Sequence, residues 1–167
     1  MARASLREYQ IALSERLQSA AAGTRVPSKL GLRVGAEGWL VDLREAGEVI
    51  PVPVISPVPL ARPWFKGVAN VRGNLYSVSD LGALLGFQPT PMTDRARLLL
   101  VADRFRAGAA LLIESSLGLR NADELKLHAG EAARWVRAHY EDAEGKHWKE
   151  LDVPALIQDE SFLEVSA

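Results

Sequence analysis

Residues 64–81 read WFKGVANVRGNLYSVSDL, and this stretch predicts a β-hairpin. Two apolar segments, 67–71 and 75–79, flank Arg72-Gly73-Asn74. Glycine and asparagine readily adopt the positive φ that a tight hairpin turn requires. The local chemistry of this turn therefore predicts two antiparallel strands that pair from it outward.

Short apolar runs bounded by turn residues continue on both sides of this hairpin, and each run is typical of a strand. Asp80 and Asp152 are placed to cap short helices that reach Leu85 and Ile157. A helical turn is expected over residues 44–49. Prolines in the stretch 51–59 exclude helix and predict an edge strand with an irregular loop. Further strands are predicted at 30–34, 39–43, 98–102, 107–113, 117–120, 135–140 and 147–151, and no element is assigned to 121–131.

Many short strands with few long helices predict a mainly β protein, built as barrels or a sandwich. The amino-terminal part differs, because Leu6, Tyr9, Leu13 and Leu17 recur at helical spacing. We therefore expect a helical extension and linker over residues 1–28 and the main domain over residues 29–167. The helix either packs on its own domain or docks a partner.

Composition excludes several classes of protein. The 167 residues include 20 Lys and Arg against 21 Asp and Glu, so no basic excess favours nucleic-acid binding. The sequence has no cysteine, which excludes disulfides and thiolate chemistry. No apolar run approaches the about 20 residues of a membrane span, and the amino terminus lacks the layout of a secretion signal. We expect a cytoplasmic protein without membrane insertion.

The sequence offers little to an enzyme. It contains neither a Gly-rich phosphate loop nor a G-x-S-x-G nucleophile motif. His139 and His147 face each other across a predicted hairpin, but no third metal ligand is evident. We therefore predict no catalytic activity, no metal and no cofactor.

The hairpin stretch closely resembles the signature of the CheW family of chemotaxis coupling proteins. Phe65, Gly67, Val68, Asn70, Val71, Arg72, Gly73, Leu75, Val78, Asp80 and Leu81 match that signature in type. Ser77 replaces the proline expected at its position, and Ser79 replaces a residue that is usually apolar. Weaker similarity extends over residues 30–163, through Glu48-Val49-Ile50 and through the strand that contains Leu111.

The resemblance implies a fold and a function. The expected fold is two small, intertwined five-stranded β-barrels of SH3-like type, with short connecting helices. The expected function is that of a non-catalytic adaptor, which holds the regulatory domain of a CheA-type histidine kinase against the cytoplasmic tip of a methyl-accepting chemoreceptor. The helical extension and the diverged second half are most similar to the PilI subgroup, which serves type IV pili and twitching motility.

The resemblance also implies a partner-binding set, which consists of Glu48, Lys66, Gly67, Asn70, Arg72 and Gly73. The guanidinium of Arg72 either pairs with a partner carboxylate or binds nearby loop carbonyls. Glu48 either solvates a strand end or pairs with a basic kinase surface, and Lys66 is either solvated or a rim contact. Asn70 is expected to hold the turn, and both glycines are backbone requirements.

One alternative comes from a different class of protein, a small regulatory or ligand-binding β-barrel without a receptor. The two hypotheses differ in the surfaces they require. An adaptor needs two separate patches, so we ask whether the Arg72 face and the edge at residues 51–55 are both exposed.

Overall fold

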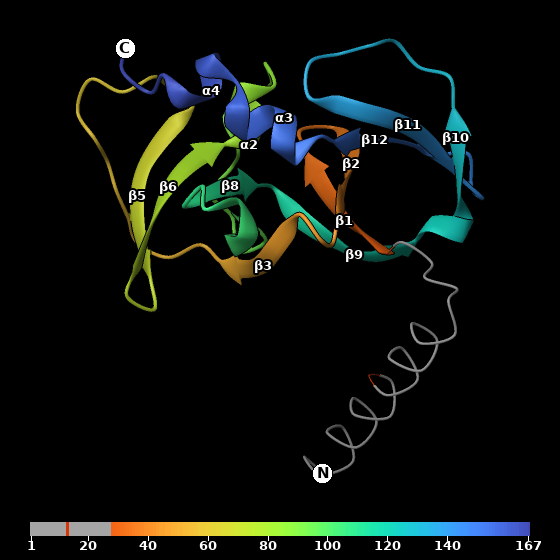
Figure 1. Cartoon of the computed structure of the whole chain (residues 1–167), viewed down its shortest axis with the longest axis horizontal. Coiled ribbons are helices and arrows are strands. Elements are labelled where there is room, and N and C mark those ends of the chain that lie inside the picture. Colours follow the sequence, from red (N-terminus) through yellow and green to blue (C-terminus); the bar gives the residue numbers. More distant parts are fainter. Residues whose placement is uncertain (1–12, 14–27) are drawn as a thin grey trace.

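The computed structural model describes residue 13 and residues 28–167, and the described chain forms two six-stranded sheets (Figure 1). Apart from Leu13, the helix that we predict before residue 28 lies outside this part of the chain, as does most of the linker. In spatial order, the first sheet contains β10 (Leu125–His128), β11 (Val136–Asp142), β12 (His147–Leu151), β2 (Glu37–Asp42), β1 (Ser28–Val34) and β9 (Ser115–Asn121). The second contains β3 (Ala46–Pro51), β7 (Arg97–Val101), β8 (Ala109–Ile113), β6 (Asn74–Asp80), β5 (Phe65–Val71) and β4 (Ile55–Ser56).

The chain path intertwines the two sheets. The second sheet uses consecutive strands, β3 to β8, whereas the first sheet is built from strands at both ends of the described chain. β12 therefore pairs in parallel with β2, and the remaining neighbours in that sheet are antiparallel. In the second sheet, β6 and β8 form the parallel pair.

Short helices join the strands and end the chain. Asp80 caps α2 (Leu81–Leu84), and Gly86, with a φ of +90°, follows that helix as predicted. Asp152 caps α3 (Val153–Gln158) in the same way. The other helices are η1 (Asp103–Phe105), η2 (Ala122–Glu124) and α4 (Glu160–Leu163). No helix in the described part of the chain has both the length and the hydropathy to cross a membrane.

The mainly β class with two sheets is confirmed, and each sheet has six strands where five were expected. The helical turn expected over residues 44–49 is wrong. Glu45 donates its backbone N–H to the carbonyl of Asp42 in a tight turn, and β3 then begins at Ala46 and pairs with β7. Pairing with a distant strand outweighs the local helical preference there. Strand β10 and helix α4 were not predicted.

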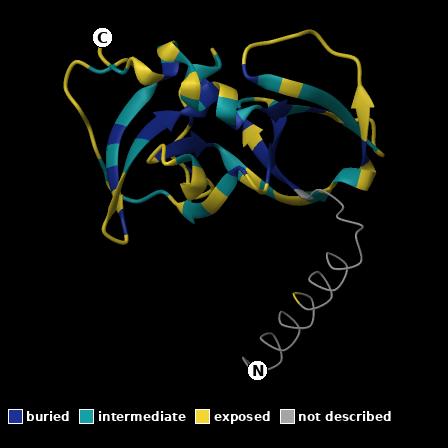
Figure 2. Cartoon of the chain, in the orientation of Figure 1, coloured by how far each residue is buried: buried dark blue, intermediate teal, exposed yellow. Residues whose placement is uncertain are grey.

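Apolar side chains form three clusters, one between the sheets and one within each. The shared cluster joins Trp39 and Val41 of the first sheet to Leu99 and Leu111 of the second. β8 is buried along its whole length, because its alternate residues enter the shared cluster and the cluster of the second sheet. Figure 2 shows this burial where the two sheets meet. The sheets are therefore packed as one unit.

Candidate functional site

The turn between β5 and β6 presents Arg72 at the tip of the hairpin. Arg72 has a φ of +50° and Gly73 a φ of +88°, the pattern of a type I′ turn. The Asn70 side-chain oxygen accepts a hydrogen bond from the Gly73 N–H at 2.9 Å. Asn70 therefore holds the turn, as expected, and Arg72 occupies a backbone conformation that glycine or asparagine adopts more easily.

Arg72 pairs with Glu48 of β3 in a bidentate contact. Its Nη1 donates to Oε1 of Glu48 at 3.2 Å, and its Nη2 donates to the second carboxylate oxygen. This hydrogen-bonded pair holds the pKa of Glu48 below its ordinary value. Both side chains remain exposed, Arg72 by 68% and Glu48 by 46%. Glu48 and Arg72 lie 24 residues apart in the chain and are thus brought together across strands that are not neighbours in the sheet.

Gly67 has a structural role in the contact between β4 and β5. Its φ is +131°, and a Cβ built there would lie 2.0 Å from the carbonyl oxygen of Ser56. The pairing of β5 with β6 shifts register between Phe65 and Gly67. The position therefore requires glycine so that the two backbones can approach.

Lys66 lies beside the buried carboxylate of Asp80 and is not fully solvated. Its Nζ is 4.0 Å from Oδ2 of Asp80, and its side chain is 32% exposed. Asp80 also accepts hydrogen bonds from the Thr90 N–H at 2.8 Å and the Thr90 hydroxyl at 2.6 Å, while it caps α2. Lys66 thus adds a cation beside a carboxylate that organises the loop after α2.

Exposed apolar side chains flank the Arg72–Glu48 pair. Val54 is 88% exposed and Leu75 is 68% exposed. Leu75 pairs in register with Asn70, and Val54 precedes Ile55, which pairs with Ala69. The surface formed by Glu48, Val54, Asn70, Arg72 and Leu75 is called the hairpin-tip surface below.

The proline-rich edge joins this surface and does not form a separate one. Within residues 51–55, Val52 and Ile55 pack on the cluster of the second sheet, whereas Val54 is exposed. The edge is therefore both packed and partly open, and it lies next to the hairpin tip. The Arg72 face and the edge at residues 51–55 therefore form one exposed patch and not the two separate patches that an adaptor needs.

A second apolar surface lies between the second sheet and the carboxy-terminal helices. It is a groove of about 440 Å³ whose walls come from β5, β6, η1, α3 and α4. Leu163 at its rim is 61% exposed. Its main apolar lining residues are Phe65, Phe105, Ile157, Phe162, Leu163 and Val165.

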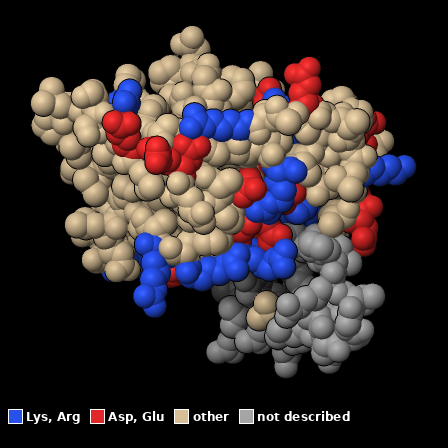
Figure 3. All heavy atoms as spheres, turned by 45° about the horizontal axis from the view of Figure 1, so that its top comes forward, with Lys and Arg blue, Asp and Glu red and all other residues tan. Residues whose placement is uncertain are grey.

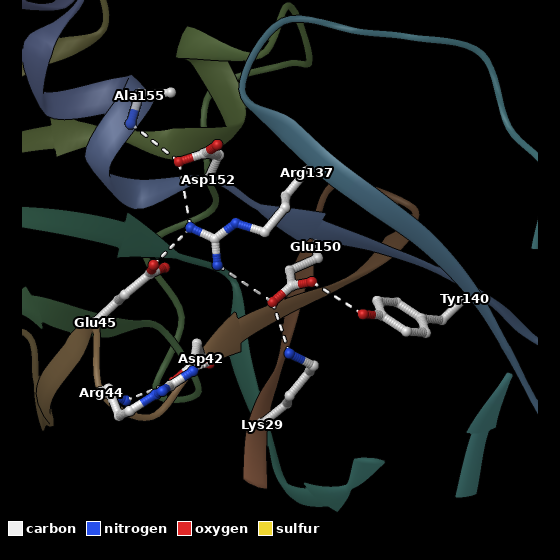
Figure 4. Close-up of polar contacts among 9 residues, drawn as sticks. All are labelled: Lys29, Asp42, Arg44, Glu45, Arg137, Tyr140, Glu150, Asp152 and Ala155. Atoms are coloured by element: carbon white, nitrogen blue, oxygen red, sulfur yellow. Dashed lines mark hydrogen bonds and ion pairs between the residues drawn. The ribbon is translucent and has the colours of Figure 1, made fainter. Parts of the chain in front are cut away.

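A buried ionic network in the first sheet was not predicted from the sequence (Figure 4). Lys29 of β1 donates to Oε1 of Glu150 on β12 at 2.7 Å, and their side chains are only 7% and 3% exposed. The Tyr140 hydroxyl donates to Oε2 of Glu150 at 3.2 Å, and Nη1 of Arg137 lies 3.5 Å from Oε1. Burial, together with the Glu150 carboxylate, raises the pKa of Tyr140.

Arg137 extends the network to the turn between the two sheets. Its Nη2 donates to Glu45 at 2.5 Å and to Asp152 at 3.3 Å. Nearby, Arg44 donates two side-chain hydrogen bonds to Asp42, at 3.0 and 2.8 Å, and these lower the pKa of Asp42 to about 2. The network links β1, β11 and β12 to the β2–β3 connection, where the chain passes from one sheet to the other.

The surface charges do not favour one sign. Lysine, arginine, aspartate and glutamate side chains lie next to each other near the middle of the face drawn in Figure 3. Ion pairs such as Arg33–Glu114 and Lys149–Glu37 also join opposite charges on the surface of the described chain.

Comparison with known proteins identifies the family to which this architecture belongs. Residues 29–161 match the CheW-like domain family. The chain belongs to this CheW-like family. It is 31% identical over 143 residues to Protein PilI of Pseudomonas aeruginosa PAO1. The aligned residues cover 83% of this chain and 80% of the relative. The resemblance expected from the hairpin signature is thereby confirmed.

A solved structure supports the CheW-like fold. The crystal structure of the scaffolding protein TtCheW from Thermoanaerobacter tengcongensis aligns with a TM-score of 0.62, over 75% of this chain and 88% of that chain. The two sequences are 14% identical, so this likeness concerns the fold. The two sheets of the CheW-like domain are thus an arrangement shared with a distant scaffolding protein.

Proposed function

We propose that the chain is a non-catalytic adaptor, which holds the regulatory domain of a CheA-type histidine kinase against the cytoplasmic tip of a methyl-accepting chemoreceptor. We place it in the cytoplasm, at membrane-associated receptor arrays. Membership of the CheW-like family supports the adaptor role. Similarity to Protein PilI supports an output in type IV pilus twitching motility.

The hairpin-tip surface is the proposed kinase contact, and the backbone of Arg72 is the observation that carries this assignment. A non-glycine residue at φ +50° costs stability that a glycine or asparagine would avoid. The side chain placed there is 68% exposed and paired in a fork with Glu48, with Val54 and Leu75 beside it. Charged groups among exposed apolar residues are typical of a protein interface.

The test is calorimetric titration with the regulatory domain of a CheA-type kinase from the same genome. Arg72→Glu is expected to weaken binding by about 1–3 kcal/mol, the scale of one lost charged contact. Arg33→Glu is the matched control, because Arg33 is also exposed, by 50%, and is paired with a carboxylate, Glu114, at 3.7 Å. Equal affinity of the folded Arg72→Glu variant and the parent protein would refute the kinase contact.

A charge swap separates a partner contact from an internal role. In the double variant Glu48→Arg, Arg72→Glu, the ion pair is restored with its signs exchanged. If the pair only stabilises the barrel, the double variant regains normal affinity. If the partner recognises the pair, its own charges now face the wrong sign, and the affinity stays low.

We assign the groove between the second sheet and α4 to the receptor, because an adaptor needs a second surface away from the kinase contact. Its apolar lining suits the packing of a helical receptor tip. Leu163→Glu is expected to weaken receptor binding at least about tenfold, since a charge would be buried in the contact. Leu119→Glu, at a residue 50% exposed on β9, is the control. Loss of kinase binding in Leu163→Glu with receptor binding unchanged would reverse the assignment.

A further inference from the structure

Two histidines and one glutamate converge on neighbouring strands of the first sheet. His128 ends β10, Glu141 lies on β11, and His147 begins β12. Oε2 of Glu141 is 3.5 Å from Nδ1 of His128 and 3.2 Å from Nε2 of His147. The two imidazole rings have centroids 4.4 Å apart. Three potential ligand atoms, all within 4.8 Å of one another, therefore meet at one place on the surface.

We propose that His128, Glu141 and His147 form a binding site for a divalent transition-metal ion, with Zn²⁺ as its reference occupant. Zinc takes imidazole nitrogen at about 2.0–2.1 Å, so tetrahedral ligand atoms lie about 3.3 Å apart. The two measured separations from Glu141 straddle this value. Two histidines with one carboxylate are a ligand set that zinc uses, with a further position left for water or another ligand.

The surroundings favour a cation. His128 and Glu141 also line a cavity of about 750 Å³, and the other charged residues of its lining are four acids and one lysine. These are Asp123, Glu124, Asp142, Glu144 and Lys126. The excess of carboxylates adds a negative potential beside the ligand atoms. All three ligands are partly exposed, by 41%, 40% and 64%, so an ion reaches them without opening the fold.

The third histidine of the chain does not belong to this site. His139 pairs in register with His128 on β10 and with Lys149 on β12, but its Nε2 lies 2.9 Å from the carbonyl oxygen of Glu131. The pair across the hairpin considered from the sequence, His139 and His147, is thus not the one that the fold assembles. The site needs β10, which carries His128 alongside β11. Because its Nε2 contacts the Glu131 carbonyl oxygen, His139 is the internal control for nonspecific binding to imidazole, and as the in-register neighbour of His128 it is a stringent one.

Isothermal titration of the full chain with Zn²⁺, after removal of metals by chelation, tests the site. We expect one Zn²⁺ per chain with a micromolar or tighter dissociation constant. His128→Ala, His147→Ala and Glu141→Gln are each expected to weaken binding at least about tenfold, whereas His139→Ala leaves it unchanged. Circular dichroism of each metal-free variant checks that its fold is intact. We expect an intact fold because the three side chains are partly exposed.

Hydrogen exchange supplies a readout that weak surface binding does not reproduce. The ion would connect three strands, and among the described residues β10 is the outer strand of its sheet, paired only with β11. Zn²⁺ is expected to slow exchange of the amides in Leu125–His128, and this slowing is lost in His147→Ala. Three results would overturn the proposal: millimolar affinity, one ion shared by two chains, or unchanged affinity in His128→Ala. None of them bears on kinase or receptor binding.

Discussion

Removing the buried charge of Glu150 is expected to destabilise the protein more than removing that of Lys29, because the two residues have unequal numbers of partners. Glu150 accepts from Lys29 at 2.7 Å and from Tyr140 at 3.2 Å, and Arg137 lies 3.5 Å away. Among the described residues, Lys29 has a side-chain hydrogen bond only to Glu150. Glu150→Gln therefore leaves a buried ammonium without its hydrogen-bonded carboxylate, whereas Lys29→Met leaves a carboxylate that still has the Tyr140 hydroxyl and the Arg137 guanidinium beside it.

The expected losses of unfolding free energy follow from the partners that each substitution leaves behind. Breaking a buried ion pair by removing one charge costs about 3–5 kcal/mol, and Glu150→Gln is expected in this range. Lys29→Met is expected to cost about 1–3 kcal/mol, since the remaining carboxylate keeps its hydrogen bond from Tyr140 and its ion pair with Arg137. The double variant should cost less than the sum of the two, with a coupling energy of about 1–3 kcal/mol. Arg33→Met, which breaks an exposed pair, is the control and should cost at most about 1 kcal/mol.

Urea unfolding monitored by tryptophan fluorescence measures these differences. Trp39 and Trp148 are 3% and 1% exposed, so their emission reports the loss of the core around the first sheet. The reasoning fails if Lys29→Met costs as much as Glu150→Gln, or if the two substitutions are additive within about 0.5 kcal/mol. Additivity would mean that the two charges do not depend on each other for their burial.

Two further predictions concern the backbone and the pH dependence. Gly67→Ala is expected to cost at least about 3 kcal/mol of unfolding free energy, since a Cβ would meet the Ser56 carbonyl. Gly73→Ala, at an open position with φ +88°, should cost only about 1 kcal/mol. Equal losses of the two variants in urea unfolding would contradict this prediction. Asp42, whose pKa falls from 3.8 to about 2, stabilises the fold above pH 4 and loses this effect as the pH falls toward 2. Asp42→Asn should therefore reduce the change in unfolding free energy between pH 4 and pH 2. The reduction is at most about 2 kcal/mol, because Arg44 is 75% exposed and its charge is screened. An unchanged slope of unfolding free energy against pH would contradict the assigned pairing.

The sequence predicts best where local chemistry decides the structure. The turn at Arg72-Gly73, the cap at Asp80 and the left-handed Gly86 each depend on a few neighbouring residues, and all are confirmed. The hairpins formed by β1 with β2 and by β11 with β12 are confirmed for the same reason. Such signals need no knowledge of distant parts of the chain.

Features that depend on distant residues were missed. β10 is four residues long, too short for its alternation Leu-Lys-Leu-His to identify a strand, and its Leu127 is 78% exposed. Lys29 and Glu150 are 121 residues apart in the chain, and their types suggest solvent exposure and not a buried pair. The same holds for the proposed metal site, because its third ligand lies on β10.

The residues of the candidate partner-binding set could be named from the sequence, but their contacts could not. The resemblance to the CheW family names Glu48 and Arg72 independently, but only the fold pairs them across the second sheet. It names Gly67 as well, and the structure explains that residue by the approach of the Ser56 backbone. A family signature thus mixes residues that shape the surface with residues that form it, and the substitutions above distinguish the two.

The packing of the two sheets bears on how the proposed adaptor holds its partners. The hairpin-tip surface lies on the second sheet, and the groove has one wall from that sheet and another from α3 and α4. Those helices contribute Leu156 and Phe162 to the cluster shared by both sheets. A well-packed core transmits displacement and does not absorb it. The two proposed contacts are therefore held at a fixed separation, which is what an adaptor needs in order to set the position of a kinase relative to a receptor.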